Sequence, residues 1–339
     1  MSKKNSSVNL RKRFNNLTYT SSIFLKFKNK LDKLKKKKFT VAVSGGPDSL
    51  ALVALTKIYS SSKKTKFYYV LVDHNIRKDS DNEAQKVKHL LKKNNVNLKI
   101  ILNRKKITRN IQGEARRIRY EILINYCKKN KINTILTGHN LEDQVETFFI
   151  RLSRGSGLKG LSAMKPLSKI HNRVNLYRPL LDIKKDFLIK ISKDVFGKYF
   201  RDPSNRNLKY LRTKVRNLKK PLENSGIEYE QIIKSINNLA MSKATLEDYF
   251  NKIFKDIIKK NKKKVFINFK KFKEHNKEIK IALINESIKI LKKNYYNSRS
   301  KKVDNLIKTI EKRDFKKSTL GGCIFILEKE NLCLKIEKT

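Results

Sequence analysis

The chain has 339 residues and a formal net charge of +52 at pH 7, from 82 Lys and Arg residues against 30 Asp and Glu residues. This length accommodates two compact domains, and a hydrophobic content of 39% is enough for packed cores, which excludes a wholly disordered chain. All apolar runs are far shorter than a bilayer span, so we expect a cytoplasmic protein without membrane contact. The basic excess favours a nucleic acid partner, although AT-rich codon usage also raises the lysine content.

Three cysteines are present, Cys127, Cys323 and Cys333, and none lies in a CxxC pair or near histidines at metal-ligand spacing. The sequence therefore predicts no zinc site, iron–sulfur cluster or disulfide framework. Cys127 falls within a predicted helix, where we expect it to be part of a core.

The N-terminal segment has two interpretations. Residues 1–31 contain no Asp or Glu and several Lys, Arg and Ser, which is also the composition of an organellar transit peptide. The apolar residues between Ile23 and Leu34 are equally typical of an amphipathic helix before the first strand. We assign residues 1–38 to a basic leader helix and leave its removal open.

Apolar runs typical of buried strands alternate with helical patterns through residues 39–218. Such alternation predicts right-handed βαβ units, and hence an α/β fold with a Rossmann-like parallel sheet covered by helices on both faces. Ligands bind such sheets beyond the carboxyl ends of the strands, so functional residues should gather there. The predicted strands are Phe39–Val43, Phe67–Val72, Leu98–Leu102, Thr134–Thr137 and Leu176–Leu180, and the helices are Ser49–Tyr59, Asn82–Lys93, Glu114–Lys129 and Glu142–Leu152.

A change of pattern marks a second domain, which we place at residues 219–339. The chain from Leu211 to about Lys312 is mostly helical, with lysine-rich faces and few aromatic residues at stacking intervals. Cys323–Leu327 and Leu332–Ile336 then predict a terminal hairpin. We expect a smaller, mainly helical domain that binds nucleic acid through backbone phosphates.

The segment most informative about chemistry joins the first predicted strand directly to a helix. Glycines let the backbone approach a phosphate, serine hydroxyls and N–H groups donate to it, and the helix N-terminus adds positive potential. A carboxylate in the same turn can hold Mg²⁺ against a pyrophosphate, whereas an ordinary helix cap is the alternative. The segment consists of Ser44, Gly45, Gly46, Pro47, Asp48 and Ser49, with Asp48 as the predicted metal ligand.

Polar residues also follow the second and fourth predicted strands. Asp73 and His74 end the second strand, where they either face a ligand or simply cap the turn. His139 follows the fourth strand, and Asp143 and Glu146 share one helix face because they are three residues apart. Two such carboxylates can bind an ammonium group or a metal ion, and a solvent-facing acidic pair is the alternative.

Arginines cluster in three places. Arg116 and Arg119 stand near a helix start, where they oppose the helix dipole and favour an anionic partner unless they pair with Glu114 or Glu121 on the surface. A basic, glycine-rich loop further on suits the approach of phosphate or ribose. This loop includes Arg151, Arg154, Gly155, Ser156 and Gly157, and the third group is Arg212 and Arg216.

The order of these segments resembles a known family of enzymes. Ser44–Ser49 is similar to the PP-loop of the N-type ATP pyrophosphatases, which cleave ATP between the α and β phosphates and adenylylate a carbonyl oxygen. The later segments resemble, in order, the motifs of the tRNA(Ile)-lysidine synthases. They are Leu71–Arg77, Glu114–Tyr120, Thr137–Thr147, Arg151–Leu161, Arg178–Leu181 and Asp202–Asn205.

Three residues depart from the pattern of that family. Asn140 and Glu142 stand where His and Asp are usual, and Thr213 stands where Asn is usual. His139, Asp143 and Glu146 match the pattern, so their roles in the family can be carried over to this sequence.

The resemblance implies ATP and Mg²⁺ as cofactors, and L-lysine and a tRNA(Ile) with a CAU anticodon as partners; it leaves a homodimer open. The C2 oxygen of cytidine 34 would attack ATP with release of pyrophosphate, and the lysine ε-amine would then displace AMP. The implied catalytic residues are Asp48, Arg116, Asp143 and Glu146. ATP would contact Ser44, Gly45, Gly46, Pro47, Asp48, Ser49, Asp73, His74 and His139, and tRNA would contact Arg119, Arg151, Arg154, Gly155, Ser156, Gly157, Arg212 and Arg216.

Three other functions remain open at this stage. A small-molecule ligase similar to NAD synthetase would share the phosphate loop but would leave the basic charge and the second domain unexplained. A tRNA thiolase usually needs catalytic or cluster-binding cysteines. A non-enzymatic RNA-binding protein would not need Asp48 or Ser49 in the loop.

Overall fold

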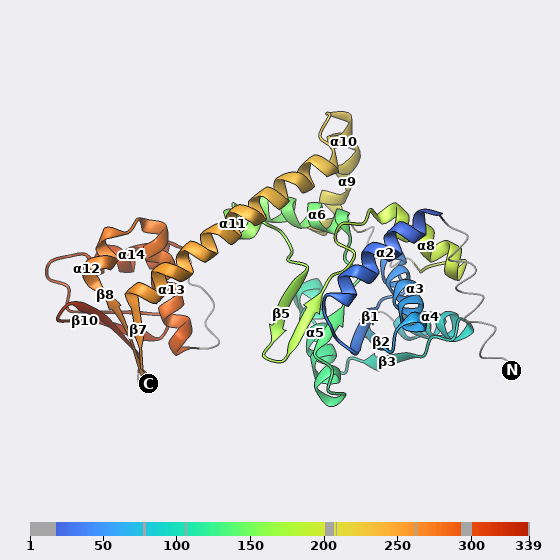
Figure 1. Ribbon diagram of the computed structural model, residues 1–339, viewed down its shortest axis with the longest axis horizontal. Helices are drawn as coiled ribbons and strands as arrows, with labels where there is room; N and C mark the ends of the chain where they lie inside the picture. The colour runs from blue at the N-terminus through green and yellow to red at the C-terminus, as the bar shows by residue number, and fades with distance from the viewer. Residues whose placement is uncertain are drawn as a thin grey trace. The chain divides into compact units, whose positions relative to one another are not determined.

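The computed structural model describes residues 18–76, 79–105, 107–200, 207, 209–261, 263–292 and 300–337 (Figure 1). Arg77 and Asp202–Asn205, which belong to two of the motifs, lie outside the described residues, as do residues 1–17 of the leader segment. The chain forms two compact units, Met1–Leu239 and Ala240–Thr339. The domain boundary that the sequence places at residue 219 stays a prediction.

A six-stranded sheet forms the centre of the first unit, in the order β3-β2-β1-β4-β6-β5. Neighbouring strands from β3 to β6 pair in parallel, which confirms the predicted parallel sheet, and the edge strand β5 pairs antiparallel with β6. The sequence prediction did not include β5. The strands are β1 (Lys38–Val43), β2 (Lys66–Asp73), β3 (Leu98–Leu102), β4 (Thr134–Leu136), β5 (Leu167–His171) and β6 (Val174–Tyr177).

Helices cover both faces of this sheet, as predicted (Figure 1). Val41 and Val43 of β1 pack against α2, α3, α4 and α8, whereas Ala42 packs against α5 on the opposite face, because successive side chains of a strand alternate. None of the helices in the described ranges combines the length and apolar character that crossing a bilayer requires. The helices are α2 (Thr18–Asp32), α3 (Pro47–Ser62), α4 (Ser80–Lys93), α5 (Ile111–Lys129), α6 (Leu141–Leu152), α7 (Leu158–Leu161), α8 (Lys185–Phe196), α9 (Leu211–Asn217), α10 (Lys219–Asn224) and α11 (Tyr229–Ile257).

The N-terminal helix α2 is part of the core of the first unit. Its residues Ile23, Phe27 and Leu31 recur every fourth position and are all buried in the cluster that contains α3 and α8. The ring of Phe27 meets Tyr59 of α3 edge to face, with 6.5 Å between the ring centroids. Residues 18–32 therefore stabilise the sheet domain.

A five-stranded antiparallel sheet, in the order β7-β8-β11-β10-β9, forms the second unit together with the C-terminal part of α11 and the helices α12 to α14. The predicted terminal hairpin is β10 and β11, whereas the other three strands were not predicted. The helices pack on this sheet through apolar residues such as Phe272, Leu283 and Ile307. The elements are β7 (Ile258–Lys260), β8 (Lys264–Asn268), α12 (Phe269–Glu274), α13 (Lys277–Leu291), α14 (Ser300–Ile310), β9 (Lys317–Leu320), β10 (Cys323–Glu328) and β11 (Asn331–Ile336).

We predict that Phe27→Ala lowers the free energy of unfolding of the first unit by about 3–5 kcal/mol, because the ring is fully buried and its removal leaves a cavity. Leu25→Ala, on the exposed side of the same helix, should change it by less than about 0.5 kcal/mol. Urea unfolding of both variants measures the difference. Equal, small effects would mean that α2 is not needed by the core.

Candidate active site

The predicted functional residues lie where the strand order of the sheet reverses. β1 pairs with both β2 and β4. The helix that follows β1, α3, lies on one face of the sheet, and the helix that leads into β4, α5, lies on the other face. A crevice opens beyond the carboxyl ends of β1 and β4 in such a sheet. The two strand-end loops are in close contact, because a Cβ at Gly138 would lie 2.7 Å from the carbonyl oxygen of Asp48.

The loop after β1 is preorganised by its own hydrogen bonds. Ser49 Oγ accepts a hydrogen bond from Ser44 N at 3.1 Å and donates one to Gly46 O at 3.0 Å. Gly45 has a φ of +78°, and a Cβ there would lie 2.5 Å from a Val87 methyl carbon, so this position requires glycine. Gly46 is the N-cap of α3, which places the positive end of that helix at the loop.

The carboxylate of Asp48 has the properties expected of a Mg²⁺ ligand. It lies in the first turn of α3, and its Oδ1 is buried with no hydrogen-bond partner among the described residues. The pKa of Asp48 is raised to about 6, chiefly by burial and also by the nearby Asp143, against the lowering effects of Lys185 and Asn140. A single carboxylate suits Mg²⁺ bound to a nucleotide, because phosphate and water oxygens complete its octahedral shell.

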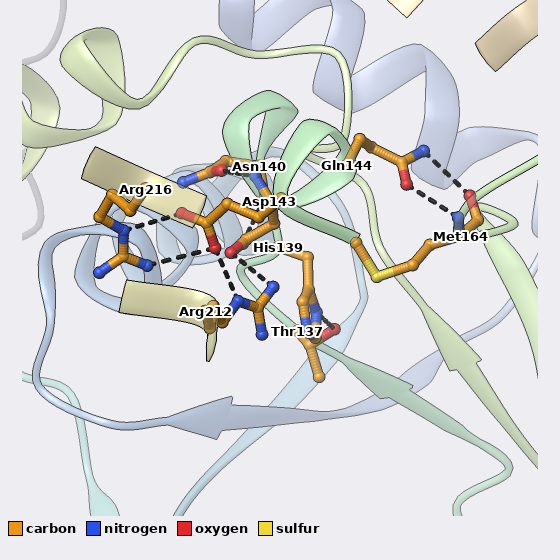
Figure 2. A network of polar contacts seen from close by, with 9 residues as sticks. Thr137, His139, Asn140, Asp143, Gln144, Met164, Arg212 and Arg216 are labelled. Carbon is orange, nitrogen blue, oxygen red and sulfur yellow. Dashed lines mark hydrogen bonds and ion pairs between the residues drawn. The ribbon is translucent and has the colours of Figure 1, made fainter. Parts of the chain in front are cut away.

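The start of α6 is fixed by a capping box (Figure 2). Asn140 Oδ1 accepts from Asp143 N at 2.9 Å, and Asp143 Oδ2 accepts in return from Asn140 N at 3.1 Å. Asparagine is among the best N-cap residues, which gives the departure from the family pattern at this position a structural role. The second departure, Glu142, is buried and accepts a hydrogen bond from Lys185 N at 2.9 Å, so it anchors the start of α8.

Two arginines of α9 neutralise the acidic pair of α6. Arg212 Nε lies 2.6 Å from Glu146 Oε2, and its second bond reaches Asp143 Oδ1 at 3.2 Å (Figure 2). Arg216 Nε lies 2.8 Å from Glu146 Oε1. The Glu146 side chain is only 3% exposed, so these charge-assisted bonds form where little water competes. The structure thus pairs residues predicted to bind an ammonium group or a metal ion with residues predicted to bind tRNA.

A second group of arginines surrounds His139. Burial and the positive charges of Arg116, Arg178 and Arg212 together lower the pKa of this histidine to about 3, so the ring is neutral at physiological pH. Its Nδ1 lies 2.8 Å from the Thr137 hydroxyl. Arg116 stacks over the Tyr120 ring, 5.1 Å from its centroid.

Arg178 was in a motif of the sequence but was not among the predicted site residues. It is nine-tenths buried and donates from Nη1 to Lys165 O at 2.8 Å and to Ser168 Oγ at 2.9 Å. Its Nε has no hydrogen-bond partner among the described residues. The only signal in the sequence was the motif Arg178–Leu181, which gives no indication of burial beside His139.

The end of β2 brings together two residues predicted for different ligands. Arg119 Nε donates to His74 Nε2 at 3.2 Å, and burial together with Arg119 lowers the pKa of His74 to about 4. Asp73 is buried, and its Oδ1 accepts from Asn75 N at 2.9 Å in a turn. Its Oδ2 has no partner in the part of the chain that the structure describes. The turn at Asp73 therefore uses one carboxylate oxygen and leaves the other available to a ligand.

The basic, glycine-rich loop follows α6. Arg154, Gly155 and Gly157 are exposed, and Ser156 is half-buried. The guanidinium of Arg151 turns back onto this loop and bonds to its backbone. The contacts with ATP, lysine and tRNA that the sequence predicts for all these residues stay predictions.

Comparison with known proteins identifies the class of domain to which the first unit belongs. A family model described as a PP-loop domain matches residues 19–222. The U34-tRNA thiolase NcsA from Methanococcus maripaludis shares the fold, with a TM-score of 0.55 at 21% identity over 65% of this chain and 78% of that one. The first unit is thus a PP-loop domain, the class of ATP-using enzymes that the loop at Ser44–Ser49 indicates.

Relatives in sequence then identify the family. The tRNA(Ile)-lysidine synthase of Wolbachia pipientis wMel is 33% identical over 299 residues, 87% of this chain and 69% of that protein. The enzyme of the same name from Orientia tsutsugamushi (strain Boryong) is 43% identical over 188 residues, 55% of this chain and 42% of that protein. The chain belongs to the tRNA(Ile)-lysidine synthase family of PP-loop ligases, and it spans less than half of the Orientia relative.

We predict that Asp48→Asn stabilises the protein at pH 7.5 by up to about 3 kcal/mol, because the folded state raises the pKa of Asp48 from 3.8 to about 6 and so disfavours the ionised form. The advantage should shrink as the pH falls from about 6 and vanish below about 4, where Asp48 is protonated in both states. Urea unfolding with a chelator present measures it. Asp81→Asn, on the exposed face of α4, should show no such trend. A difference in unfolding free energy between Asp48→Asn and the wild type that does not change with pH would contradict the prediction.

We also predict that Glu146→Gln destabilises the first unit by about 2–4 kcal/mol, because two guanidinium groups lose the charge that balances them. Glu121→Gln removes exposed ion pairs to Lys105 and Arg117 and should cost much less, because water screens both pairs. Thermal and urea unfolding compare the two variants. Similar losses would show that burial does not strengthen the cluster at Glu146.

Proposed function

We propose that the protein joins L-lysine to C2 of cytidine 34 in a tRNA(Ile) with a CAU anticodon, with conversion of ATP to AMP and pyrophosphate. The observation that carries this proposal is the preorganised loop at Ser44–Ser49 with the unpaired carboxylate oxygen of Asp48, beside the loop that holds His139 and the acidic pair. Membership of the lysidine synthase family supports the choice of substrates.

In the first step the C2 oxygen of cytidine forms a bond to the α-phosphorus, and the bond from that phosphorus to pyrophosphate breaks. The loop Ser44–Ser49 binds the departing pyrophosphate through N–H groups and hydroxyls. Asp48 would hold Mg²⁺, which supplies neutralisation of phosphate charge when bound. Arg116 adds positive charge near the α-phosphate, and the neutral His139 ring can donate or accept one hydrogen bond there.

In the second step the lysine ε-amine bonds to C2, and the bond from C2 to the oxygen of AMP breaks. The acidic pair Asp143 and Glu146 would attract the lysine ammonium group before it loses a proton. In this structure Arg212 is bonded to both carboxylates, and Arg216 is bonded to Glu146. Lysine binding there therefore requires at least one arginine to change partner, and the tRNA phosphates offer one.

Residues 219–339 would hold the body of the tRNA through its phosphates. Their lysine-rich surface supports this, and such contacts are strongly salt-dependent because they release counterions. The first turns of α11 belong to the first unit, since Tyr229, Ile232 and Ile236 pack with Leu141 and Val145 of α6. A shortened protein should therefore keep residues to Leu239.

The cysteines argue against sulfur transfer. Cys127 is buried with its Sγ 3.2 Å from the Thr40 hydroxyl, and burial raises its pKa. Cys323 and Cys333 are also buried, and burial raises the pKa of each. A thiol with a raised pKa is a poor nucleophile, which favours the ligase over a thiolase.

We predict that the protein incorporates radiolabelled L-lysine into a CAU-anticodon tRNA(Ile) transcript when ATP and Mg²⁺ are present. Asp48→Ala should reduce incorporation at least about 100-fold, because the carboxylate at the phosphates is lost. Asp81→Ala serves as the matched surface control. Lysine incorporation at the wild-type rate by Asp48→Ala would remove Asp48 from the site, and no incorporation by the wild type would refute the proposed function.

A further inference from the structure

One residue connects both ends of the glycine-rich loop that follows α6. The backbone oxygen of Arg151 accepts from the N–H groups of Arg154 and Ser156, each at 3.1 Å. Its guanidinium Nη1 donates to Gly160 O at 2.6 Å and to Ala163 O at 2.9 Å. Arg151 therefore closes the loop from Ser153 to Ala163 with its backbone at one end and its side chain at the other.

The Nη1 group of the Arg151 guanidinium is directed at the backbone of this loop. Both hydrogens of Nη1 have an acceptor, and no carboxylate lies within ion-pair distance of Arg151 in the described part of the chain. The side chain is half-buried, and burial lowers its pKa. Arg154, three residues later, is exposed and matches Arg151 in charge.

The conformation of the loop needs such support. Gly155, three residues after the end of α6, has a φ of +65°, and Ala163 has a φ of +49°, which is uncommon for a residue with a Cβ. Next to Ala163, the backbone of Met164 donates to Gln144 Oε1 at 2.8 Å and accepts from Gln144 Nε2 at 3.0 Å (Figure 2). Side chains of α6 thus fix the far end of the loop at two successive residues.

The outer side of the loop is open to a ligand. Apart from each glycine and its two chain neighbours, no atom of the described residues lies within 4 Å of the position that a Cβ would take at Gly155 or Gly157. Arg154 and Lys159 are exposed beside them. An accessible backbone with basic side chains suits a phosphodiester, which accepts hydrogen bonds from N–H groups and arginine alike.

We propose that Arg151 is a positioning residue: it fixes the loop so that Arg154 and the backbone at Gly155 and Gly157 meet the phosphodiester backbone of the tRNA, and it does not itself contact a phosphate. The proposal rests on the proposed function for its ligand. It gives Arg151 a different role from Arg154, although the sequence assigns both to tRNA contact.

The matched pair Arg151→Met and Arg154→Met tests this, because each variant loses one positive charge. We expect Arg154→Met to reduce the slope of log tRNA affinity against log salt by about 0.7–0.9, the value for one phosphate contact. Arg151→Met should weaken tRNA binding about tenfold or more without changing the slope. A slope loss equal to that of Arg154→Met, or an unchanged affinity, would overturn the positioning role.

Amide hydrogen exchange over residues 153–164 tests the loop without tRNA. Exchange should be faster in Arg151→Met and unchanged in Arg154→Met, and wild-type protection in Arg151→Met would overturn the proposal. Arg151→Lys keeps the positive charge. If this variant bound tRNA with wild-type affinity while the amides of residues 153–164 still exchanged faster, the positioning role would also be overturned. A wild-type protein that shows protection but binds no tRNA would refute the proposed function and the tRNA part of this proposal, and would leave the closure of the loop by Arg151 supported.

Discussion

The close approach of two strand-end loops is the constraint on which the site depends. Because β4 lies directly beside β1, the chain after β4 passes the first turn of α3, and Gly138 leaves no room for a Cβ against the backbone of Asp48. This contact brings the phosphate loop next to His139, the capping box and the acidic face of α6. A bulkier residue at this point would separate the phosphate-binding and acidic parts of the crevice.

Much of the first unit could be predicted from the sequence because its signals are local. The inner strands β1, β2 and β4 are mostly apolar, as expected for strands covered on both faces, and Gly45 and Gly46 mark the turn that follows β1. The short strands β5, β7 and β9 could not be predicted because they lack such local signals. They contain lysines and only three to five residues, and are stabilised mainly by pairing with a neighbour.

The partners of charged side chains could not be predicted. The sequence placed Asp143 and Glu146 on one helix face, but nothing local shows that Arg212 and Arg216, nearly seventy residues later, bond to them. Nor does a run of arginines show which are buried: Arg151 bonds to carbonyls and Arg154 is exposed, although they differ by three positions in the same motif. These differences arise from tertiary packing.

The cluster of Glu146, Asp143, Arg212 and Arg216 has two negative and two positive groups, so it is electrically balanced as it stands. A third cation could join it only at the cost of like-charge repulsion in a weakly hydrated place. Exchange of one guanidinium for one ammonium ion leaves the net charge of the cluster unchanged. Its electrostatic cost is therefore small compared with leaving the carboxylates without a counter-ion. If a cation binds this cluster as proposed, its entry and the release of one arginine are stoichiometrically linked.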